Sequence, residues 1–417
     1  MNRHLRGLDW LNFFVANFQA GFGPFISIYL TSAGWTLGAI GEVLSAGTIA
    51  AMASQVPSGA LVDAITRKRT AAAGAIVAVM LSALCIALWP AFLPIASAEV
   101  LHAFASSALG PAIAALSLVL VGHAALGERL GRNARYAALG NALAAGLMGL
   151  FGYYLSGRAV FLLTAALGLP ALAALMAIGE HSVSRSMPAD GAPVSATEPA
   201  ARRGSWRLLG DRRLLIFCLC AALFQLANAA MLPIAAGLVT QRAGRVAPLV
   251  IAACIVGPQF ITALVSPWAG RIAQSWGRRP VLLIGFVVLP IRGALLAAVV
   301  NPFMMILIQL LDGLSAAALG VLTPLIVADI TRETGYYTTC LGLVGLAVGG
   351  GATLSTTAAG LVADRFGGGA SFLSLAWVGL CAAALVAAAM PETRPPAPAQ
   401  TASTPASTRP DRSPRQG

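Results

Sequence analysis

Residues 98–110 read AEVLHAFASSALG and residues 308–320 read IQLLDGLSAAALG, so one apolar pattern returns at an offset of 210. Two further pairs return at nearly the same offset: 209 for GFGPFI (21–26) with AMLPIA (230–235), and 211 for GALVDAITRKR (59–69) with GRIAQSWGRRP (270–280). Chance similarity between apolar segments is common, but it does not keep register at three separate places. We therefore interpret the chain as a duplication of two halves.

The composition indicates a membrane protein. Of the 417 residues, 58% are hydrophobic and only 10% are charged, whereas a soluble domain carries about 25% charged residues. Apolar runs of the length that spans a bilayer, about 20 residues, follow one another closely. Because the runs are unbroken, they predict an all-α polytopic protein and not a β-barrel, which would show short alternating strands.

Twelve apolar spans are predicted, at 9–30, 36–62, 70–89, 93–122, 135–156, 159–179, 213–239, 247–273, 281–300, 303–329, 337–361 and 370–390. Each half holds six, so the two halves share one orientation in the membrane and are expected to form two pseudo-symmetric six-helix bundles. The expected domains are an N-terminal bundle (1–179), a flexible cytoplasmic linker (180–211), a C-terminal bundle (212–390) and a disordered cytoplasmic tail (391–417).

The cations predict the topology. With the N-terminus inside, 22 of the 27 Lys and Arg residues fall in inner segments; the outer segments hold only Arg158, Arg242, Arg245 and Arg365, and Arg292 lies within a span. This bias predicts that both termini are cytoplasmic. The net charge of +12 is therefore interpreted as a topology signal, and no nucleic-acid partner is expected. The basic start, MNRHLR, runs into a full-length span without a cleavage pattern, so we expect that span to be retained.

Several chemistries are not predicted. The six cysteines lie in apolar spans and form no CxxC pair, so neither a metal site nor a disulfide is expected. No GxxxxGK[ST] phosphate loop occurs, which leaves ATP-driven transport unsupported. We expect no enzyme activity and no cofactor.

The twelve spans, the six-plus-six repeat, the central linker and the basic phrase after the second span of each half together resemble the major facilitator superfamily (MFS) of transporters, up to about residue 394. In that family the phrase runs Gly-x-Leu-x-Asp, then a second Gly and several cations. The first copy departs from it at Thr66 and the second at Gln274. The matching positions, with Gln274 in place of the Asp, are Gly59, Asp63, Arg67, Lys68, Arg69, Gly270, Gln274, Gly277, Arg278 and Arg279.

Two further stretches bear on the branch of the family. MPETR (390–394) is similar to a phrase found at half ends in the bacterial drug and metabolite efflux branch. Exporters of that branch usually carry a Gly-Pro step in the fifth span, but here that span reads LGNALAAGLMGLFGYYL (139–155) and has no proline. The missing proline weakens the interpretation of this chain as an antiporter of the exporting branch.

Asp63 is expected to act as a gate. The resemblance places it near the N-terminal end of the eleventh helix, beside Tyr336 and Tyr337, where the positive end of the helix dipole favours a carboxylate. Such a contact would form when the cytoplasmic side closes, and it would bias a two-state equilibrium without touching substrate. The alternative is that this phrase, with its cations, only fixes the topology.

Ionisable residues within the spans are functional suspects, because a buried charge in a membrane is costly. They are Glu42, Glu99, His102, Arg292 and Asp312. Glu99 and His102 share one helix face at i, i+3, and His102 is the repeat equivalent of Asp312. Since the first, fourth, seventh and tenth helices of the family line the central cavity, the resemblance places His102 and Asp312 across it. Glu42 is either interfacial or a peripheral gate.

The four coupling candidates leave two alternatives open. Arg292 and Asp312 lie at similar depth and are expected to meet, in which case Asp312 is either a static ion-pair partner or a coupling group. If Asp312 is paired, Glu99 with His102 becomes the better proton site. The candidates for substrate binding are polar or aromatic residues of the same helices, with helix–helix hydrogen bonding as the competing role: Asn17, Gln19, Phe22, Gln225, Asn228 and Gln309.

The prediction from sequence is a secondary transporter of a small organic molecule that works by alternating access, with proton-coupled efflux preferred. Proton-driven uptake, facilitated diffusion and a non-transporting membrane sensor remain alternatives. The expected partners are membrane lipid, the small-molecule substrate and protons, with the proton gradient as the energy source. We expect a monomer in the bacterial inner (plasma) membrane. The identity of the substrate stays open.

Overall fold

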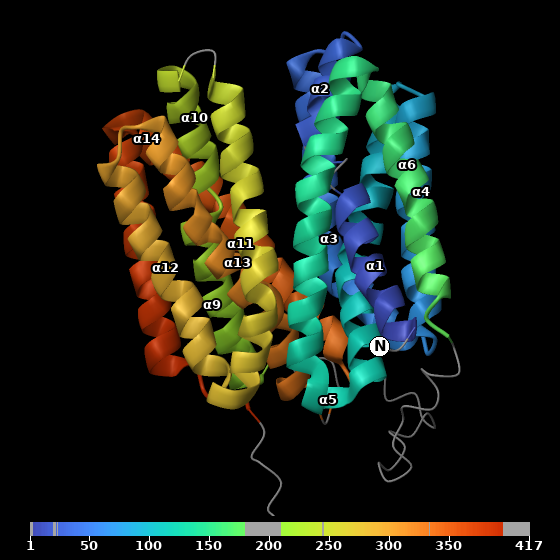
Figure 1. The fold of residues 1–417 in the computed structure, drawn as a ribbon. Helices are drawn as coiled ribbons and strands as arrows, with labels where there is room; N and C mark the ends of the chain where they lie inside the picture. Colours follow the sequence, from blue (N-terminus) through green and yellow to red (C-terminus); the bar gives the residue numbers. More distant parts are fainter. Residues whose placement is uncertain are drawn as a thin grey trace, which may run out of the picture.

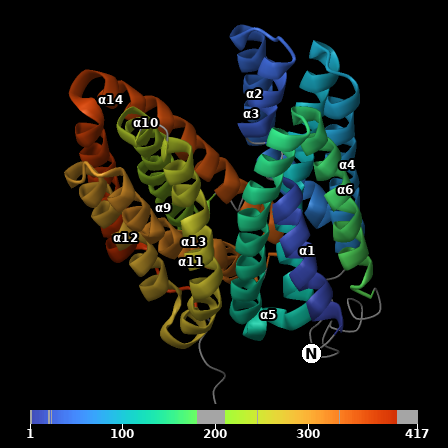
Figure 2. The same cartoon turned by 45° about the horizontal axis from the view of Figure 1, so that its top comes forward.

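The computed structural model describes residues 3–19, 22, 24–179, 210–243, 246–332 and 334–394. Most of the predicted linker (180–211) and of the predicted tail (391–417) lies outside these residues. Within the described ranges the chain is helical and contains no strand. Figure 1 shows two groups of helices side by side, α1 to α6 in one group and α9 to α14 in the other, and Figure 2 shows the same division.

The first group contains six helices: α1 (Arg3–Gln19), α2 (Pro24–Ser32), α3 (Leu37–Ala64), α4 (Lys68–Leu88), α5 (Phe92–Tyr154) and α6 (Gly157–Met176). The long α5 holds two spans, because the backbone turns at Gly122, whose φ of 67° lies in the left-handed region that glycine adopts without strain. Chain direction alternates, so α1 begins, α3 ends and Gly122 lies at one end of the molecule. We call this end the terminal end; it carries the N-terminus in Figure 1.

The second group repeats this pattern. Its helices are α9 (Arg212–Asn228), α10 (Met231–Ala243), α11 (Ala247–Trp276), α12 (Arg278–Ala298), α13 (Pro302–Ile330) and α14 (Tyr337–Ala389). Gly367, with a φ of 86°, divides α14 into two spans as Gly122 divides α5. The first span of each half is also broken at related places, between Gln19 and Pro24 and between Asn228 and Met231.

The predicted number of spans agrees with these helices. Nine described segments are long and apolar enough to cross a membrane; one of them runs through α9 and α10, and two others, α5 and α14, each hold two spans. The broken α1–α2 segment supplies the remaining span of the first half. The prediction of an all-α membrane protein with twelve spans is confirmed.

One predicted loop is wrong. The segment 123–134 between the fourth and fifth spans was expected to be a cytoplasmic loop, yet the helix resumes at His123 directly after the turn at Gly122. Arg129 therefore lies in a helix and is buried, and with Arg132 it pairs with Asp9 of α1. A single left-handed glycine reverses the chain here, so no longer loop is needed.

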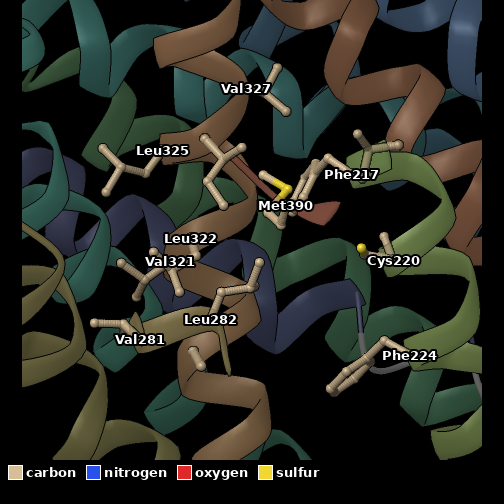
Figure 3. Close-up of a cluster of buried hydrophobic side chains, with 14 of the residues drawn as sticks. Phe217, Cys220, Phe224, Val281, Leu282, Val321, Leu322, Leu325, Val327 and Met390 are labelled. Carbon is tan, nitrogen blue, oxygen red and sulfur yellow. The ribbon is translucent and has the colours of Figure 1, made fainter. Parts of the chain in front are cut away.

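The apolar core of the second half reaches across to the first. Figure 3 shows part of this cluster, including Phe217 and Phe224 of α9 and Leu322 of α13. Leu126 and Leu130 from the second part of α5 belong to the same cluster. Between membrane helices the stability comes from close packing rather than from excluding water. The two halves therefore share packed side chains where α5 meets α11 and α13.

Candidate functional site

The halves meet at the terminal end through Asp63, in the last turn of α3. Its Oδ1 accepts from the backbone N–H of Thr338 at 3.1 Å, and its Oδ2 accepts from the N–H and hydroxyl of Thr339 at 2.8 and 2.7 Å. These N–H groups belong to the first turn of α14, which has no intrahelical partners for them and carries the positive end of the helix dipole. Asp63 thus contacts the expected helix. Its partners, Thr338 and Thr339, directly follow the expected neighbours Tyr336 and Tyr337.

Gly59 brings the two helices into contact one turn earlier. The hydroxyl of Thr338 donates to the Gly59 carbonyl at 2.6 Å, and a Cβ at Gly59 would clash with the backbone of Thr338. We call this contact of Gly59 and Asp63 with Thr338 and Thr339 the first seam. Lys68 stays within its own half and donates to the carbonyls of Val62 and Asp63 at the end of α3. Arg67 is exposed and Arg69 is half-buried.

The second copy of the phrase builds a weaker contact. The Gln274 amide on α11 donates to the carbonyl of Ala124, just after the turn in α5, at 2.7 Å. Gly127 and Gly270 face each other so closely that a Cβ on either would meet the other's backbone. We call this contact the second seam. In the second seam the Gln274 side chain makes one neutral hydrogen bond. In the first seam the Asp63 carboxylate accepts three hydrogen bonds.

The cations Arg278 and Arg279 of the second copy of the basic phrase bind partners within the second half. Arg278 pairs with Asp329 of α13, with Nε and Oδ2 at 2.8 Å. Gly277 adopts a φ of 109° and separates α11 from α12. Arg279 donates to the Ala387 carbonyl near the end of α14.

MPETR (390–394) caps the start of α12 through Glu392. The Glu392 carboxylate accepts from the backbone N–H groups of Arg278 at 2.8 Å, Arg279 at 3.1 Å and Arg394 at 2.9 Å. Burial alone would raise the pKa of Glu392, but the N–H groups of Arg278, Arg394 and Arg279 hold it below its ordinary value. In the structure, MPETR thus contacts the start of α12 and stabilises the second half alone.

A buried ion network ties α1 to α5 at the terminal end. Asp9, 1% exposed, accepts from Arg129 at 2.5 Å and from Arg132 at 2.6 Å. Arg129 also donates to Asn133, which in turn donates to Ser117 at 2.7 Å. The sequence alone does not reveal this network, because 120 residues separate Asp9 from Arg129.

A cavity of about 720 Å³ lies between the halves. Its wall is apolar apart from two threonines and eight side-chain amides, and none of the described residues that line it is ionisable. The amides are Asn12, Gln19, Gln55, Asn133, Asn141, Gln225, Asn228 and Gln259. Of the predicted substrate-binding residues, Gln19, Gln225 and Asn228 are among them. The other five were missed, although each is a lone amide in or beside an apolar span, which is the signal that could have found them.

A second cavity, of about 640 Å³, lies within the first half and contains Glu99, His102 and Phe22. The His102 ring stacks on Phe22 with centroids 3.6 Å apart, and its Nε2 lies 3.0 Å from the Ser106 hydroxyl. That hydroxyl accepts from the Gln19 amide at 3.3 Å. Because Gln19 and Gln55 line both cavities, the two spaces adjoin.

Glu99 is the most unusual group in this second cavity. It is 6% exposed, and its Oε1 has no hydrogen-bond partner in the part of the chain that the structure describes. Gly47 of α3 leaves room for the carboxylate, since a Cβ there would come within 2.8 Å of Oε2. The structure thus leaves a buried carboxyl beside a cavity, with no opposite charge among the described residues to compensate it.

Arg292 and Asp312 form an ion pair, in agreement with the contact expected from their depth. Arg292 is 1% exposed and also donates to the Asn228 Oδ1 at 2.8 Å, at the break between α9 and α10. Neither member lines a described cavity, although Asn228 does. His102 and its repeat equivalent Asp312 thus have different surroundings: one faces a cavity and the other is paired.

Three other predicted residues lie apart from the cavities. Asn17 and Gln309 are both 1% exposed and keep buried amide atoms without partners among the described residues, and neither lines either cavity. Glu42 is exposed. A search of the described residues finds no group of three or more His, Cys, Asp or Glu able to hold a metal ion.

Comparisons with known proteins agree on one family. The MFS_1 like family matches residues 5–374. The uncharacterized MFS-type transporters MT2531 and Rv2456c of Mycobacterium tuberculosis are each 36% identical over 397 residues, which cover 94% of this chain and 94% of theirs. The proton:xylose symporter XylE, solved with 6-bromo-6-deoxy-D-glucose, superposes with a TM-score of 0.73 at 14% identity over 94% of this chain and 96% of XylE. The likeness to XylE is one of fold.

Proposed function

The chain belongs to the major facilitator superfamily, and on that premise we propose that it exports a small organic molecule across the bacterial inner membrane in exchange for protons. It is a multi-pass membrane protein and a secondary transporter, not an enzyme. Efflux is the proposed direction because MPETR (390–394) is similar to a phrase of the exporting branch. Proton-driven uptake and facilitated diffusion are the competing functions.

The place where the halves meet supports alternating access as the mechanism. The two seams close the terminal end, and the large cavity lies between the halves. We assign the terminal end to the cytoplasm, because it carries most of the cations. Parting the seams while the opposite ends of the halves close would then expose the same cavity to the cytoplasm. One chain holds both halves of the site, which supports a working monomer in the lipid bilayer.

The observation that carries proton coupling is the unpartnered Glu99 carboxyl beside His102. The Glu99 side chain is buried next to the central cavity, and the two spaces share Gln19 and Gln55. A charge there has no partner among the described residues to compensate it, so a change in protonation alters the electrostatics of the neighbouring cavity strongly. Arg292 with Asp312 is a static pair in this proposal, because each already compensates the other.

The test uses proteoliposomes with an imposed pH gradient and a panel of solutes. We expect the unchanged protein to move a solute against its gradient when protons flow the other way. Glu99→Gln should abolish this pH-driven flux but retain solute exchange at equal pH, since the site itself remains. His102→Ala should weaken pH-driven flux.

Two outcomes would contradict the proposal. Full pH-driven transport by the Glu99→Gln and His102→Ala variants would remove the coupling assignment. Solute flux that does not respond to the pH gradient at all would favour facilitated diffusion. Glu42→Gln, an exposed carboxyl outside both cavities, serves as the matched control.

A further inference from the structure

We propose that the central cavity takes a neutral solute with several hydroxyl or amide groups, and that Gln55, Asn141 and Gln259 are its main hydrogen-bond partners. This inference rests on the proposed transport function and names the class of substrate. It starts from the wall of the cavity, which has eight amides and no ionisable side chain among the described residues that line it.

The absence of charge on this wall argues against an ionic substrate. A charged solute leaving water loses its hydration, and a site repays this loss only with opposite charges or with several aligned hydrogen bonds. Two cations near the wall are already occupied, because Arg292 holds Asp312 and Asn228, and Arg129 holds Asp9. The Glu99 carboxyl lies in the adjoining cavity and not on this wall. A neutral solute makes no such demand.

Three of the amides have their hydrogen-bonding capacity free. Gln55 on α3, Asn141 on α5 and Gln259 on α11 are half-buried on the cavity wall and make no side-chain hydrogen bond with any described residue. Others are engaged: Asn12 donates to the Leu8 carbonyl at 2.7 Å, and Asn133 bonds Arg129 and Ser117. The three free amides lie on three helices from both halves, so they surround a bound solute.

A side-chain amide both donates and accepts, with two N–H donors and an oxygen that accepts twice. Hydroxyl and amide groups of a solute also do both, so they match three such partners without leaving an unsatisfied group. Phe224, Val15 and Leu319 supply apolar wall for the carbon frame of the solute. The volume of about 720 Å³ lies within the range of small-molecule sites, about 300–1,000 Å³.

Gln55 also connects this site with the first seam. A Cβ at Gly342 or Gly345 of α14 would clash with the Gln55 carbonyl or its side-chain oxygen, so Gln55 lies directly against the opposite half. Asp63 follows eight residues later on the same helix, about 12 Å along its axis. A solute held by Gln55 therefore touches the helix that carries the gate residue.

The experiment measures binding to the purified full-length protein with solutes that differ in charge but share a sugar frame. N-acetylglucosamine is neutral, glucosamine is a cation and glucuronate is an anion; sorbitol, glucamine and gluconate form a second set. We expect the neutral member of at least one set to bind at least about tenfold more tightly than its charged counterparts, a difference of about 1.4 kcal/mol. Tighter binding of a charged member, or no binding by either neutral member, would overturn the proposed class.

Variants then test the three amides. Gln55→Leu, Asn141→Leu and Gln259→Leu should each weaken binding of the neutral solute about tenfold, while Gln241→Leu, an exposed amide on α10 outside both cavities, should not. Gln259→Glu should shift preference toward glucosamine, because it introduces a carboxylate into a wall whose described residues carry none. Unchanged affinity in all three Leu variants would refute the assignment of Gln55, Asn141 and Gln259 as hydrogen-bond partners. The expected gain in glucosamine binding by Gln259→Glu provides a test even if the Leu variants do not fold.

The substrate class and the transport function fail in different ways. Neutral solutes that bind but produce no flux in proteoliposomes would refute transport and leave the class intact. Flux of charged solutes alone would refute the class and leave transport intact.

Discussion

At the scale of single residues, one carboxylate makes the two halves of a near-repeat unequal. Asp63 accepts three hydrogen bonds from α14, whereas the related Gln274 donates one to α5. Bonds to a charged group contribute about 1.5–3 kcal/mol each, against about 0.5–1.5 kcal/mol for a neutral pair. The closed terminal end therefore depends on the first seam more than on the second.

Asp63→Asn should open the first seam. Asparagine keeps the size but removes the charge that the α14 dipole favours, and its N–H₂ group meets the N–H groups of α14. We expect transport to fall about tenfold or more, with membrane insertion unchanged. Flux and surface expression measure the two effects. Arg67→Gln, an exposed position in the same phrase, is the control, and an Asp63→Asn protein with full transport would exclude the gate role.

At the scale of helices, glycines decide how closely pairs approach. Gly59 faces the backbone of Thr338, whereas Gly74 on α4 has no neighbouring atom where its Cβ would lie. Both glycines are helical, so alanine improves helix propensity equally at the two positions. The difference between the two substitutions therefore reports only the helix contact.

Gly59→Ala should destabilise the closed seam by about 1–3 kcal/mol, the usual cost of forcing an extra methyl group into a packed contact. Gly74→Ala should be neutral or slightly stabilising. Melting temperature and solute flux of the two variants provide the comparison. Equal behaviour of both variants would mean that α3 and α14 do not need this close approach.

Glu392 is the helix cap with a testable pH dependence. Because the pKa of Glu392 is held below its ordinary value, its stabilising effect is fully present above the unfolded pKa, about 4.3, and is lost as the pH falls through the lowered folded pKa. Glu392→Gln should lower the melting temperature at neutral pH and reduce its fall under acid. The exposed Glu128→Gln variant should change neither, and an unaltered acid profile in Glu392→Gln would contradict the cap.

At the scale of the whole molecule, the two seams should open together. Each half moves as a unit when its helices pack tightly, and both seams join the same two halves. Breaking the first seam with Asp63→Asn should therefore also widen the second. Spin labels at the exposed residues Glu128 and Ser275, in a cysteine-free background, would report that distance. A widening confined to the first seam would show that the halves bend and do not rock.

Much of this protein was predictable because its signals repeat along the chain. The apolar runs predicted the spans, the constant offset predicted the duplication, and the resemblance to the family placed Asp63 near the eleventh helix. Local breakers were less informative: Gly122 alone makes a turn where a loop was expected, because a single residue with positive φ reverses the chain.

The sequence by itself determined the all-α membrane class, the twelve spans and the family, because these depend on composition, on continuous apolar runs and on phrases that repeat along the chain. Only the tertiary structure decided which polar residues face the cavities. Gln55, Asn141 and Gln259 lie on three helices and line the central cavity, whereas Asn17 and Gln309 on the first and tenth spans line neither cavity. The rotation of each helix about its axis depends on how all its neighbours pack. In spans that are apolar on every side, no periodicity in the sequence records that rotation.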